Sequence, residues 1–333
     1  MNHDHGRPRV GIVGATGYAG RELIALLREH PSLELAFQMG SRAGVDPEAP
    51  ALPVDPVIEP LDETRFDDVE GVFLCTPHKA AAPLALEALG RDCRVVDLSA
   101  DFRLRDPALY AATYGTQHPA PELLPEAVYG LTEFNRDAIG RAQLVANPGC
   151  YPTAALLALR PLVDAGLVDL DHGVIVDAKS GLSGAGKGAS ATTHFGNVHD
   201  NFKAYGVGTH RHAPEIRQEL GTDELVFTPH LLPVFRGILE TIYVKPAAGV
   251  DGDQWLATWT ERYAAEPFVE VYDRGLPELD RVRSTNQCHL GLAPTGSLVA
   301  LVAAIDNLVK GAAGQALQNM NLMLGVPEGD GLR

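Results

Sequence analysis

Residues 9–27 read Arg9-Val-Gly-Ile-Val13-Gly14-Ala-Thr-Gly17-Tyr-Ala-Gly20-Arg-Glu-Leu-Ile-Ala-Leu-Leu27. The stretch begins as a short apolar run, passes through a turn rich in glycine, and continues with the apolar spacing of a helix. A second apolar run, Leu33–Met39, follows. This order predicts a βαβ unit, and its glycines stand where backbone N–H groups approach a pyrophosphate at a helix N-terminus.

The glycine turn predicts a dinucleotide site formed largely by the backbone. An ordinary tight turn would use the same glycines, but the flanking strands favour the nucleotide. The second strand is followed by Ser41 and Arg42, where NAD sites usually carry an acidic residue for the ribose 2′-OH. A hydroxyl and a cation suit a 2′-phosphate instead, so we predict NADP as the cofactor. The expected contacts of the turn are Gly14, Ala15, Thr16, Gly17, Tyr18, Ala19 and Gly20.

Strands and helices continue to alternate as far as about residue 150. The apolar runs Gly71–Cys75, Arg94–Leu98 and Leu144–Ala146 have the length of buried strands. Their carboxyl ends should meet at one edge of a parallel, doubly wound sheet, which is where such sheets bind ligands.

Beyond Leu170 the pattern changes to strands with fewer helices, and Leu308–Met323 has the pattern of a terminal helix. We therefore predict an α/β protein in three parts. These are a Rossmann domain over 1–149, an α+β catalytic and dimerisation domain over 150–305, and a C-terminal helix within 306–333 that packs back on the first domain.

The composition limits the classes of partner. The 333 residues include 27 Lys and Arg and 43 Asp and Glu, for a net charge of −16. Such a surface repels phosphate backbones and anionic lipids, so we expect a small-molecule substrate and neither nucleic acid nor membrane as a partner. The four cysteines have no metal-binding or disulfide spacing. We expect no bound metal and a cytoplasmic location.

Cys150 is the candidate nucleophile. It lies between Pro148-Gly149 and Tyr151-Pro152, immediately before a helical run. A thiol at a helix N-terminus is exposed to the helix dipole, which lowers its pKa, and the same N–H groups could stabilise an oxyanion. A lone cysteine is more often a buried apolar residue, which is our interpretation of Cys75 and Cys93.

A proton-handling partner is predicted in the segment His210-Arg211-His212-Ala-Pro-Glu215. In an extended segment the two imidazoles would point to one side, whereas a helical turn would change that geometry. The sequence alone therefore leaves open which imidazole meets the sulfur. Glu215 could orient the base, as a third group does in other nucleophile–base systems.

The glycine-rich segment Ser180–Gly188 resembles a phosphate cradle without the spacing of a P-loop. We interpret it as a source of donors for an anionic substrate or a cofactor phosphate, with a flexible surface loop as the alternative.

Six motifs occur in one order along the chain and resemble those of the N-acetyl-γ-glutamyl-phosphate reductase family, within the aspartate-semialdehyde-dehydrogenase-like group. They begin at Gly14, Asp97, Asn147, Ser180, His210 and Asp306. The resemblance implies a homo-oligomer, a dimer or tetramer, that reduces N-acetyl-γ-glutamyl phosphate with NADPH to the semialdehyde and phosphate. It also implies that Cys150 is the nucleophile, His210 the base and Glu215 its orienter.

Further contacts are expected, some within these motifs and some outside them. For the cofactor they are Thr76, Pro77, Ser180, Gly181, Gly184 and Asn286. For the substrate they are Arg103, Asn147, Lys187, Arg211 and His212.

Two alternatives remain. One is the related reductase of lysine synthesis that acts on a carrier-linked aminoadipyl phosphate, although the intact Asn147-Pro-Gly-Cys150-Tyr-Pro motif and the negative charge disfavour it. The other is a regulator that senses NADP without turnover, which the pairing of a nucleophile with a base disfavours.

Overall fold

The computed structural model describes residues 6–40, 57–188, 190–191, 193–250 and 252–333. The chain forms two compact units. Unit 1 consists of Met1–Pro148 and Ala312–Leu332, and unit 2 consists of Gly149–Gly311 together with Arg333. The sequence pattern had placed the corresponding boundaries at residues 150 and 305.

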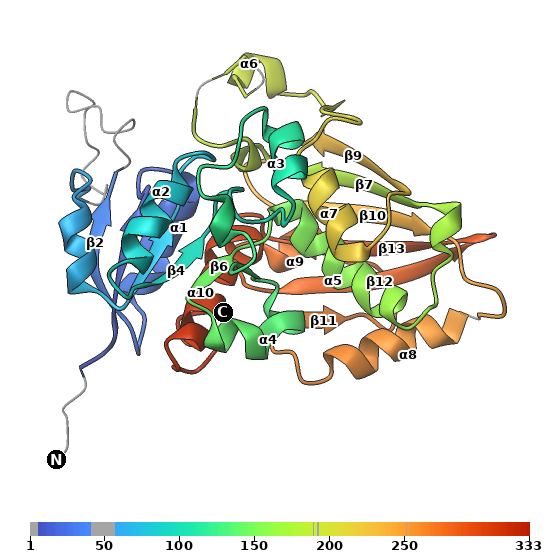
Figure 1. The fold of residues 1–333 in the computed structure, drawn as a ribbon. Coiled ribbons are helices and arrows are strands. Elements are labelled where there is room, and N and C mark those ends of the chain that lie inside the picture. Colours follow the sequence, from blue (N-terminus) through green and yellow to red (C-terminus); the bar gives the residue numbers. More distant parts are fainter. Residues whose placement is uncertain (1–5, 41–56, 189, 192, 251) are drawn as a thin grey trace. The chain divides into compact units, whose positions relative to one another are not determined.

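Unit 1 is built around a six-stranded parallel sheet in the order β2-β1-β3-β4-β6-β5 (Figure 1). Its strands are β1 (Arg9–Val13), β2 (Glu34–Met39), β3 (Gly71–Leu74), β4 (Arg94–Asp97), β5 (Val128–Tyr129) and β6 (Leu144–Ala146). Its helices are α1 (Tyr18–Arg28), η1 (Glu63–Asp68), α2 (Ala81–Leu89), α3 (Pro107–Tyr114), η2 (Pro121–Leu123), α4 (Thr132–Arg141) and α10 (Gly314–Met323). The predicted parallel, doubly wound sheet is confirmed.

The C-terminal helix α10 packs within unit 1, against α4 and β4. Its apolar residues Leu317 and Met320 join a core shared with β1, α1 and β6. Its polar side chains are buried as well, because Gln315 and Asn319 both donate to the backbone carbonyl of Gly130 (2.9 and 2.8 Å). The predicted return of the terminal helix to the first domain is confirmed.

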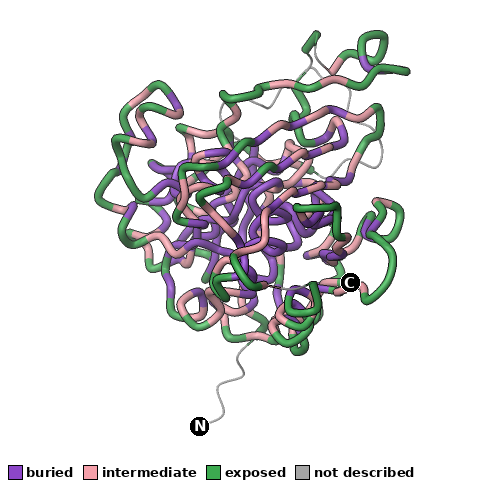
Figure 2. The backbone as a smooth tube through the Cα atoms, turned by 90° about the vertical axis from the view of Figure 1, so that its right-hand side faces the viewer, coloured by how far each residue is buried: buried purple, intermediate pink, exposed green. Residues whose placement is uncertain are grey.

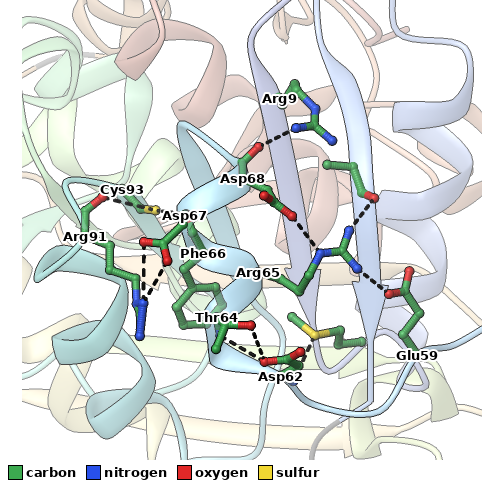
Figure 3. A network of polar contacts seen from close by, with 12 residues as sticks. Arg9, Glu59, Asp62, Thr64, Arg65, Phe66, Asp67, Asp68, Arg91 and Cys93 are labelled. Carbon is green, nitrogen blue, oxygen red and sulfur yellow. Dashed lines mark hydrogen bonds and ion pairs between the residues drawn. The ribbon is translucent and has the colours of Figure 1, made fainter.

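The segment η1 is held beside the sheet by the polar contacts in Figure 3. Arg65 forms ion pairs with Glu59 and Asp68, and Arg91 forms one with Asp67. Beneath them the Cys93 thiol is fully buried and donates to the carbonyl of Phe66 (3.1 Å). Burial raises the pKa of Cys93 to about 11, which agrees with its interpretation as a structural cysteine.

Unit 2 contains a mixed seven-stranded sheet in the order β11-β12-β13-β10-β7-β9-β8. Its strands are β7 (Val174–Ser180), β8 (Lys203–Ala204), β9 (Leu225–Leu231), β10 (Ile238–Val244), β11 (Val269–Val271), β12 (Cys288–Thr295) and β13 (Leu298–Ile305). Its helices are α5 (Cys150–Asp164), η3 (Leu170–His172), η4 (Leu182–Ala185), α6 (Phe195–Val198), α7 (His212–Leu220), α8 (Gly252–Tyr263) and α9 (Leu279–Val282), and the π-helical turn η5 (Val309–Ala313) begins in this unit. Cys288 is the buried first residue of β12.

Helices α5 and α7 lie on one face of this sheet (Figure 1). Figure 2 shows the buried segments of the backbone in the interior and the exposed segments toward the periphery. Helix α5 packs on β10 and β13, and α8 packs on α5, with Trp255 and Trp259 of α8 fully buried. The opposite face of β7 and β9 exposes apolar side chains, among them Ile175 (43% exposed) and Val226 (55% exposed). Among the described residues, the structure contains no helix whose length and hydropathy would let it cross a membrane.

A fully buried carboxyl group, that of Glu240, lies on the helix-covered face of β10. Its neighbours on the adjacent strands are Ala178 and Ala303, and neither carboxylate oxygen has a hydrogen-bond partner among the described residues. Burial raises the pKa of Glu240 well above its usual range, against the smaller opposing effect of the Lys179 charge. At a pH above the pKa of Glu240 in the unfolded chain, the folded protein therefore keeps a proton on this carboxyl group that the unfolded chain has already released.

We predict that Glu240→Gln stabilises the protein at pH 8 by about 1–3 kcal/mol and changes little at pH 5. The raised folded pKa means that the parent loses stability as pH rises above the unfolded pKa of about 4.3. Urea unfolding at both pH values measures the effect, with the exposed Glu224→Gln as the matched control. Parallel pH dependence in the parent and the Glu240 variant would contradict the prediction.

Candidate active site

Cys150 is the first residue of α5, as predicted. Gly149 is the N-cap, with extended backbone (φ −64°, ψ 151°) and no side-chain cap. The helix start is fixed by Thr153, whose N–H and hydroxyl both donate to the Gly149 carbonyl (2.9 and 3.0 Å). The half-buried Cys150 thiol therefore lies at the positive end of a 15-residue helix, where a thiolate is favoured.

Two glycines make room for this cysteine. A Cβ on Gly149 would lie 2.7 Å from Nε2 of His212, so the imidazole packs directly on the backbone before the nucleophile. A Cβ on Gly311 would lie 2.8 Å from the Cβ of Cys150 itself. Gly311 belongs to the π-helical turn η5, a form of helix that occurs often at functional sites. The sequence motif beginning at Asp306 contains this glycine, but its role depends on a contact distant in sequence.

The two imidazoles are brought together beside Cys150's helix. Their ring centroids lie 4.9 Å apart, and α7 begins at His212, so the segment turns rather than staying extended. The backbone N–H of His212 donates to Nδ1 of His210 (3.2 Å). Burial, and then the charge of Arg211, lowers the pKa of His210 to about 4. His210 is therefore neutral near pH 7, with its proton on Nε2.

Glu215 makes a contact that the sequence did not suggest. Its side chain is buried, and Oε1 accepts a hydrogen bond from the backbone N–H of Gly149 (2.8 Å). The carboxylate thereby connects α7 to the residue that precedes the nucleophile. This hydrogen bond holds the backbone at the start of α5, and the expected role of Glu215 as the orienter of an imidazole stays a prediction.

Two tyrosines complete this part of unit 2 and were given no role from the sequence. The hydroxyls of Tyr151 and Tyr205 lie 3.1 Å apart, and the rings of both contact His210. Burial raises the pKa of Tyr205 to about 12. Tyr151 follows Cys150 in a motif already noted, but no local pattern signals Tyr205, because it reaches the site from β8 and the loop after it.

The glycine-rich segment donates its N–H groups to other backbone groups of the protein. Gly181, Leu182 and Ser183 donate their N–H groups to Gly237, Val234 and Phe235, and Asn307 Nδ2 donates to the Ser183 hydroxyl (3.0 Å). The N–H groups of Gly184 and Gly186 also donate within the segment. These five N–H groups are thus engaged, so donors for an anion would come from the other groups of the segment, and its role as a source of donors stays a prediction. Ser180 is buried at the end of β7, whereas Lys187 is exposed.

In unit 1 the three glycines of the turn differ in what they permit. Gly14 has φ +88°, and a Cβ there would lie 2.4 Å from the carbonyl oxygen of Cys75. A Cβ on Gly20 would lie 2.7 Å from the Cα of Ala15. For Gly17 the nearest atom is 3.6 Å away, which is ordinary contact. The fold itself therefore needs Gly14 and Gly20, while Gly17 leaves open space at the N-terminus of α1.

That helix end suits a phosphate group. Gly17 caps α1 without a side-chain hydrogen bond, and the first turn holds no acidic residue. The neighbouring β3–α2 loop contributes Thr76, whose buried Oγ1 has no hydrogen-bond partner among the described residues. The residues present therefore fit a dinucleotide. Ser41 and Arg42, on which the choice of NADP depended, lie outside the described residues.

The other predicted contacts are placed as follows. Arg103 is buried and donates to the carbonyls of Leu98 and Asn147 (2.8 Å each). Asn147 uses both ends of its amide, accepting from Asn319 and donating to the carbonyl of Ala312. Asn286 is fully buried in unit 2. The exposed residues are Pro77 and Arg211.

The chain matches two family models. Residues 9–142 match the "Semialdehyde dehydrogenase, NAD binding domain", and residues 150–307 match the "Semialdehyde dehydrogenase, dimerisation domain". Among solved structures, aspartate semialdehyde dehydrogenase II from Vibrio cholerae has a TM-score of 0.72 at 21% identity and covers 96% of this chain and 99% of its own. The enzyme from Candida albicans, solved with NADP, has a TM-score of 0.65 at 17% identity, covering 95% and 98%. These two likenesses establish the fold.

Curated relatives are far more similar. The N-acetyl-gamma-glutamyl-phosphate reductases of Desulforudis audaxviator and Halorhodospira halophila are each 48% identical to this chain, and each alignment covers 97% of both sequences. That of Bordetella pertussis is 44% identical over 98% of this chain and 96% of its own length. The resemblance inferred from the motifs is thereby confirmed, and the chain belongs to the N-acetyl-γ-glutamyl-phosphate reductase family.

Proposed function

We propose that this chain catalyses the NADPH-dependent reduction of N-acetyl-γ-glutamyl phosphate to N-acetyl-L-glutamate 5-semialdehyde and phosphate, a step of arginine biosynthesis. One observation carries the proposal: a half-buried cysteine at a helix N-terminus lies beside two imidazoles in a chain whose relatives have this name. In the proposed organisation unit 1 binds the cofactor and unit 2 holds the reacting carbonyl.

Covalent catalysis by Cys150 accounts for both products. The thiolate attacks the acyl carbon, the carbon–oxygen bond to phosphate breaks, and phosphate leaves with the bonding pair. A thioester remains on Cys150. NADPH, when bound, supplies the hydride that reduces this carbon. Collapse of the resulting thiohemiacetal breaks the carbon–sulfur bond and releases the aldehyde. An acyl phosphate is already activated, so the protein mainly positions it and stabilises developing negative charge.

The imidazoles divide the handling of protons. The family resemblance had implied His210 as the base, but its lowered pKa and occupied Nδ1 make it a neutral donor through Nε2. In that form it stabilises charge on the substrate oxygen, as a neutral imidazole can. His212, which packs against Gly149, is left to accept the thiol proton. Glu215 fixes the backbone at Gly149, immediately before Cys150.

Positive side chains for the substrate come from the remaining predicted residues. Lys187 and Arg211 are exposed in unit 2 and can meet the carboxylate or phosphate, and His212 follows Arg211 in the chain. Arg103 and Asn147 act through the carbonyls and amides that shape the loop before Cys150. Ser180, Gly181, Gly184 and Asn286 stay as proposed cofactor contacts. For Gly181 and Gly184 the contact would be with the surface of the backbone, since their N–H groups are engaged.

The assembly proposed is a homo-oligomer. The family model that matches residues 150–307 is described as a dimerisation domain. The face of β7 and β9 opposite α5 exposes Ile175 and Val226. A second copy on that face would bury them, which is how an apolar sheet face is usually covered. The four free cysteines agree with a reduced compartment, and we place the enzyme in the cytoplasm.

The central prediction concerns Cys150→Ala. Incubating the parent with N-acetylglutamate semialdehyde, phosphate and NADP should increase the nicotinamide absorbance, and the variant should lose roughly 10³-fold or more of that rate because the nucleophile is gone. NADP binding, followed by fluorescence, should persist in the variant. Cofactor binding without turnover in the parent would favour the sensor, and preference for a carrier-linked aminoadipyl substrate would favour the lysine enzyme.

The imidazole assignment predicts a pH profile. Because the pKa of His210 is lowered to about 4, kcat/KM should show no acidic limb between pH 5 and 7 that depends on this residue. His210→Gln, which keeps an N–H donor, should retain clearly more activity than His210→Ala. An acidic limb near pH 6.5 that disappears in His210→Gln would contradict the assignment.

The glycine turn predicts separate effects at two positions. Gly17→Ala should leave the melting temperature unchanged while raising KM for NADPH about tenfold, because the added methyl occupies the space at the helix end. Gly20→Ala is the control: its methyl meets the protein's own backbone, so it should lower the melting temperature. An unchanged cofactor KM in Gly17→Ala would argue against phosphate binding at this turn.

A further inference from the structure

Helix α2 begins without any of the residues that normally cap a helix. Its N-cap is Ala80, which has helical backbone angles (φ −104°, ψ −17°) and no side chain able to accept a hydrogen bond. The first turn contains no acidic residue. A buried helix start still needs acceptors for its first N–H groups. In this protein the acceptor comes from a residue about twenty positions further along the chain.

That acceptor is Asp101, in the loop after β4. Its Oδ2 accepts from the N–H groups of Ala81 and Ala82 (3.1 and 3.2 Å), the first two residues of α2. The side chain has no exposed surface. A carboxylate at this position also interacts favourably with the positive end of the helix dipole. Asp101 thus replaces the missing cap from a different loop.

The other oxygen of the same carboxylate holds the turn before the helix. Oδ1 accepts from the N–H of Lys79 (2.7 Å) and from the hydroxyl of Tyr110 (3.0 Å). Lys79 has φ +76°, a left-handed conformation that is unfavourable for a residue with a Cβ. The bond to Asp101 therefore stabilises a backbone shape that the sequence of this turn would not choose by itself.

Asp101 is in turn held firmly. Its own N–H donates to the Ser99 hydroxyl (3.1 Å), and its carbonyl oxygen lies 2.8 Å from Nε2 of His118. The Ser99 hydroxyl donates to the buried carboxylate of Asp97 at the end of β4 (2.8 Å). These hydrogen bonds connect the Asp101 carboxylate to the end of β4. The loop that donates its N–H groups to this carboxylate is therefore held in position relative to the sheet.

The loop held by Asp101 runs from Thr76 to Ala80. Its first residue, Thr76, lies against the glycine turn. Gly14 approaches Cys75 and Thr76 so closely that a Cβ would lie 2.9 Å from the Thr76 nitrogen. Thr76 also carries the buried hydroxyl that lacks a partner among the described residues. The loop therefore lies between a fixed carboxylate at one end and the proposed phosphate site at the other.

We propose that Asp101 is a positioning residue for the cofactor: through Lys79 and the start of α2 it sets the loop that presents Thr76 to the dinucleotide. Asp101 itself does not touch the cofactor. The inference rests on the proposed function for the identity of the ligand, NADPH, and on unit 1 alone for its geometry. Loss of the carboxylate should weaken cofactor binding without affecting the chemistry at Cys150.

The test is Asp101→Asn. An amide has one acceptor oxygen and one donor nitrogen, so it cannot serve the N–H groups on both sides of the carboxylate. The dissociation constant for NADPH, measured by fluorescence, and KM for NADPH should both rise about tenfold, as for residues that orient direct ligands elsewhere. The kcat and the KM for the acyl phosphate should stay within about twofold. Hydrogen exchange in the ligand-free protein should show lost protection at Lys79, Ala81 and Ala82.

A rescue variant separates positioning from general stability. Glycine adopts positive φ freely, so adding Lys79→Gly to Asp101→Asn should recover severalfold of the lost NADPH affinity. Tyr110→Phe removes one donor and should weaken binding two- to threefold, which keeps the test open if Asp101→Asn fails to fold. Asp67→Asn, which breaks the ion pair with Arg91 beyond the other end of α2, is the matched control and should leave NADPH binding unchanged.

The outcomes are distinct. A parent that binds no NADPH would defeat the proposed function and leave the capping of α2 as a structural feature only. A parent that binds NADPH beside a folded Asp101→Asn variant of equal affinity would overturn the inference alone. A fall in kcat together with a rise in the KM for both substrates would likewise overturn it, and so would the absence of recovery with Lys79→Gly. A merely destabilising change predicts that pattern.

Discussion

The position of the Cys150 sulfur at the first turn of α5 is the constraint on which the proposed chemistry depends. A thiolate gains from the dipole only within the first turn, so the helix must begin at this residue and nowhere later. Three contacts enforce that start: Thr153 on the Gly149 carbonyl, Glu215 on the Gly149 N–H, and Gly311 against the cysteine itself. They come from three separate elements, so the reactive group is held by the packing of unit 2 as a whole.

The same principle, a helix start completed from elsewhere in the chain, occurs in unit 1 with the opposite purpose. The start of α1 has no acidic residue or side-chain cap, which leaves its N–H groups for a ligand anion. The start of α2 is closed by the carboxylate of Asp101. An open end binds a partner, whereas a closed end supports the loop beside it. Both ends follow strands of one parallel sheet, where carboxyl ends gather the loops that bind ligands.

Much of this could be predicted from the sequence because the signals were local. The βαβ glycines and the helix after Cys150 each follow from residues within one or two turns of each other. The features that were missed depend on distant contacts. No local pattern shows that Asp101 caps α2 or that Glu215 binds the Gly149 N–H. Nor does any show that N–H groups of the segment after Ser180 donate to backbone carbonyls of the protein. The role of His210 also required its environment, since burial and Arg211 set its protonation.

Glycine illustrates the limit most clearly, because one residue type serves two purposes that a sequence cannot separate. At Gly14, Gly20, Gly149 and Gly311 the missing Cβ would collide with atoms of the protein, so glycine there is a requirement of packing. At Gly17 the space is open and no internal packing explains the residue. A glycine that the fold does not need marks a surface where something other than the fold approaches the backbone. By that reasoning the least constrained glycine of the turn is the one most directly concerned with a ligand, and the tightly packed ones only hold it in place.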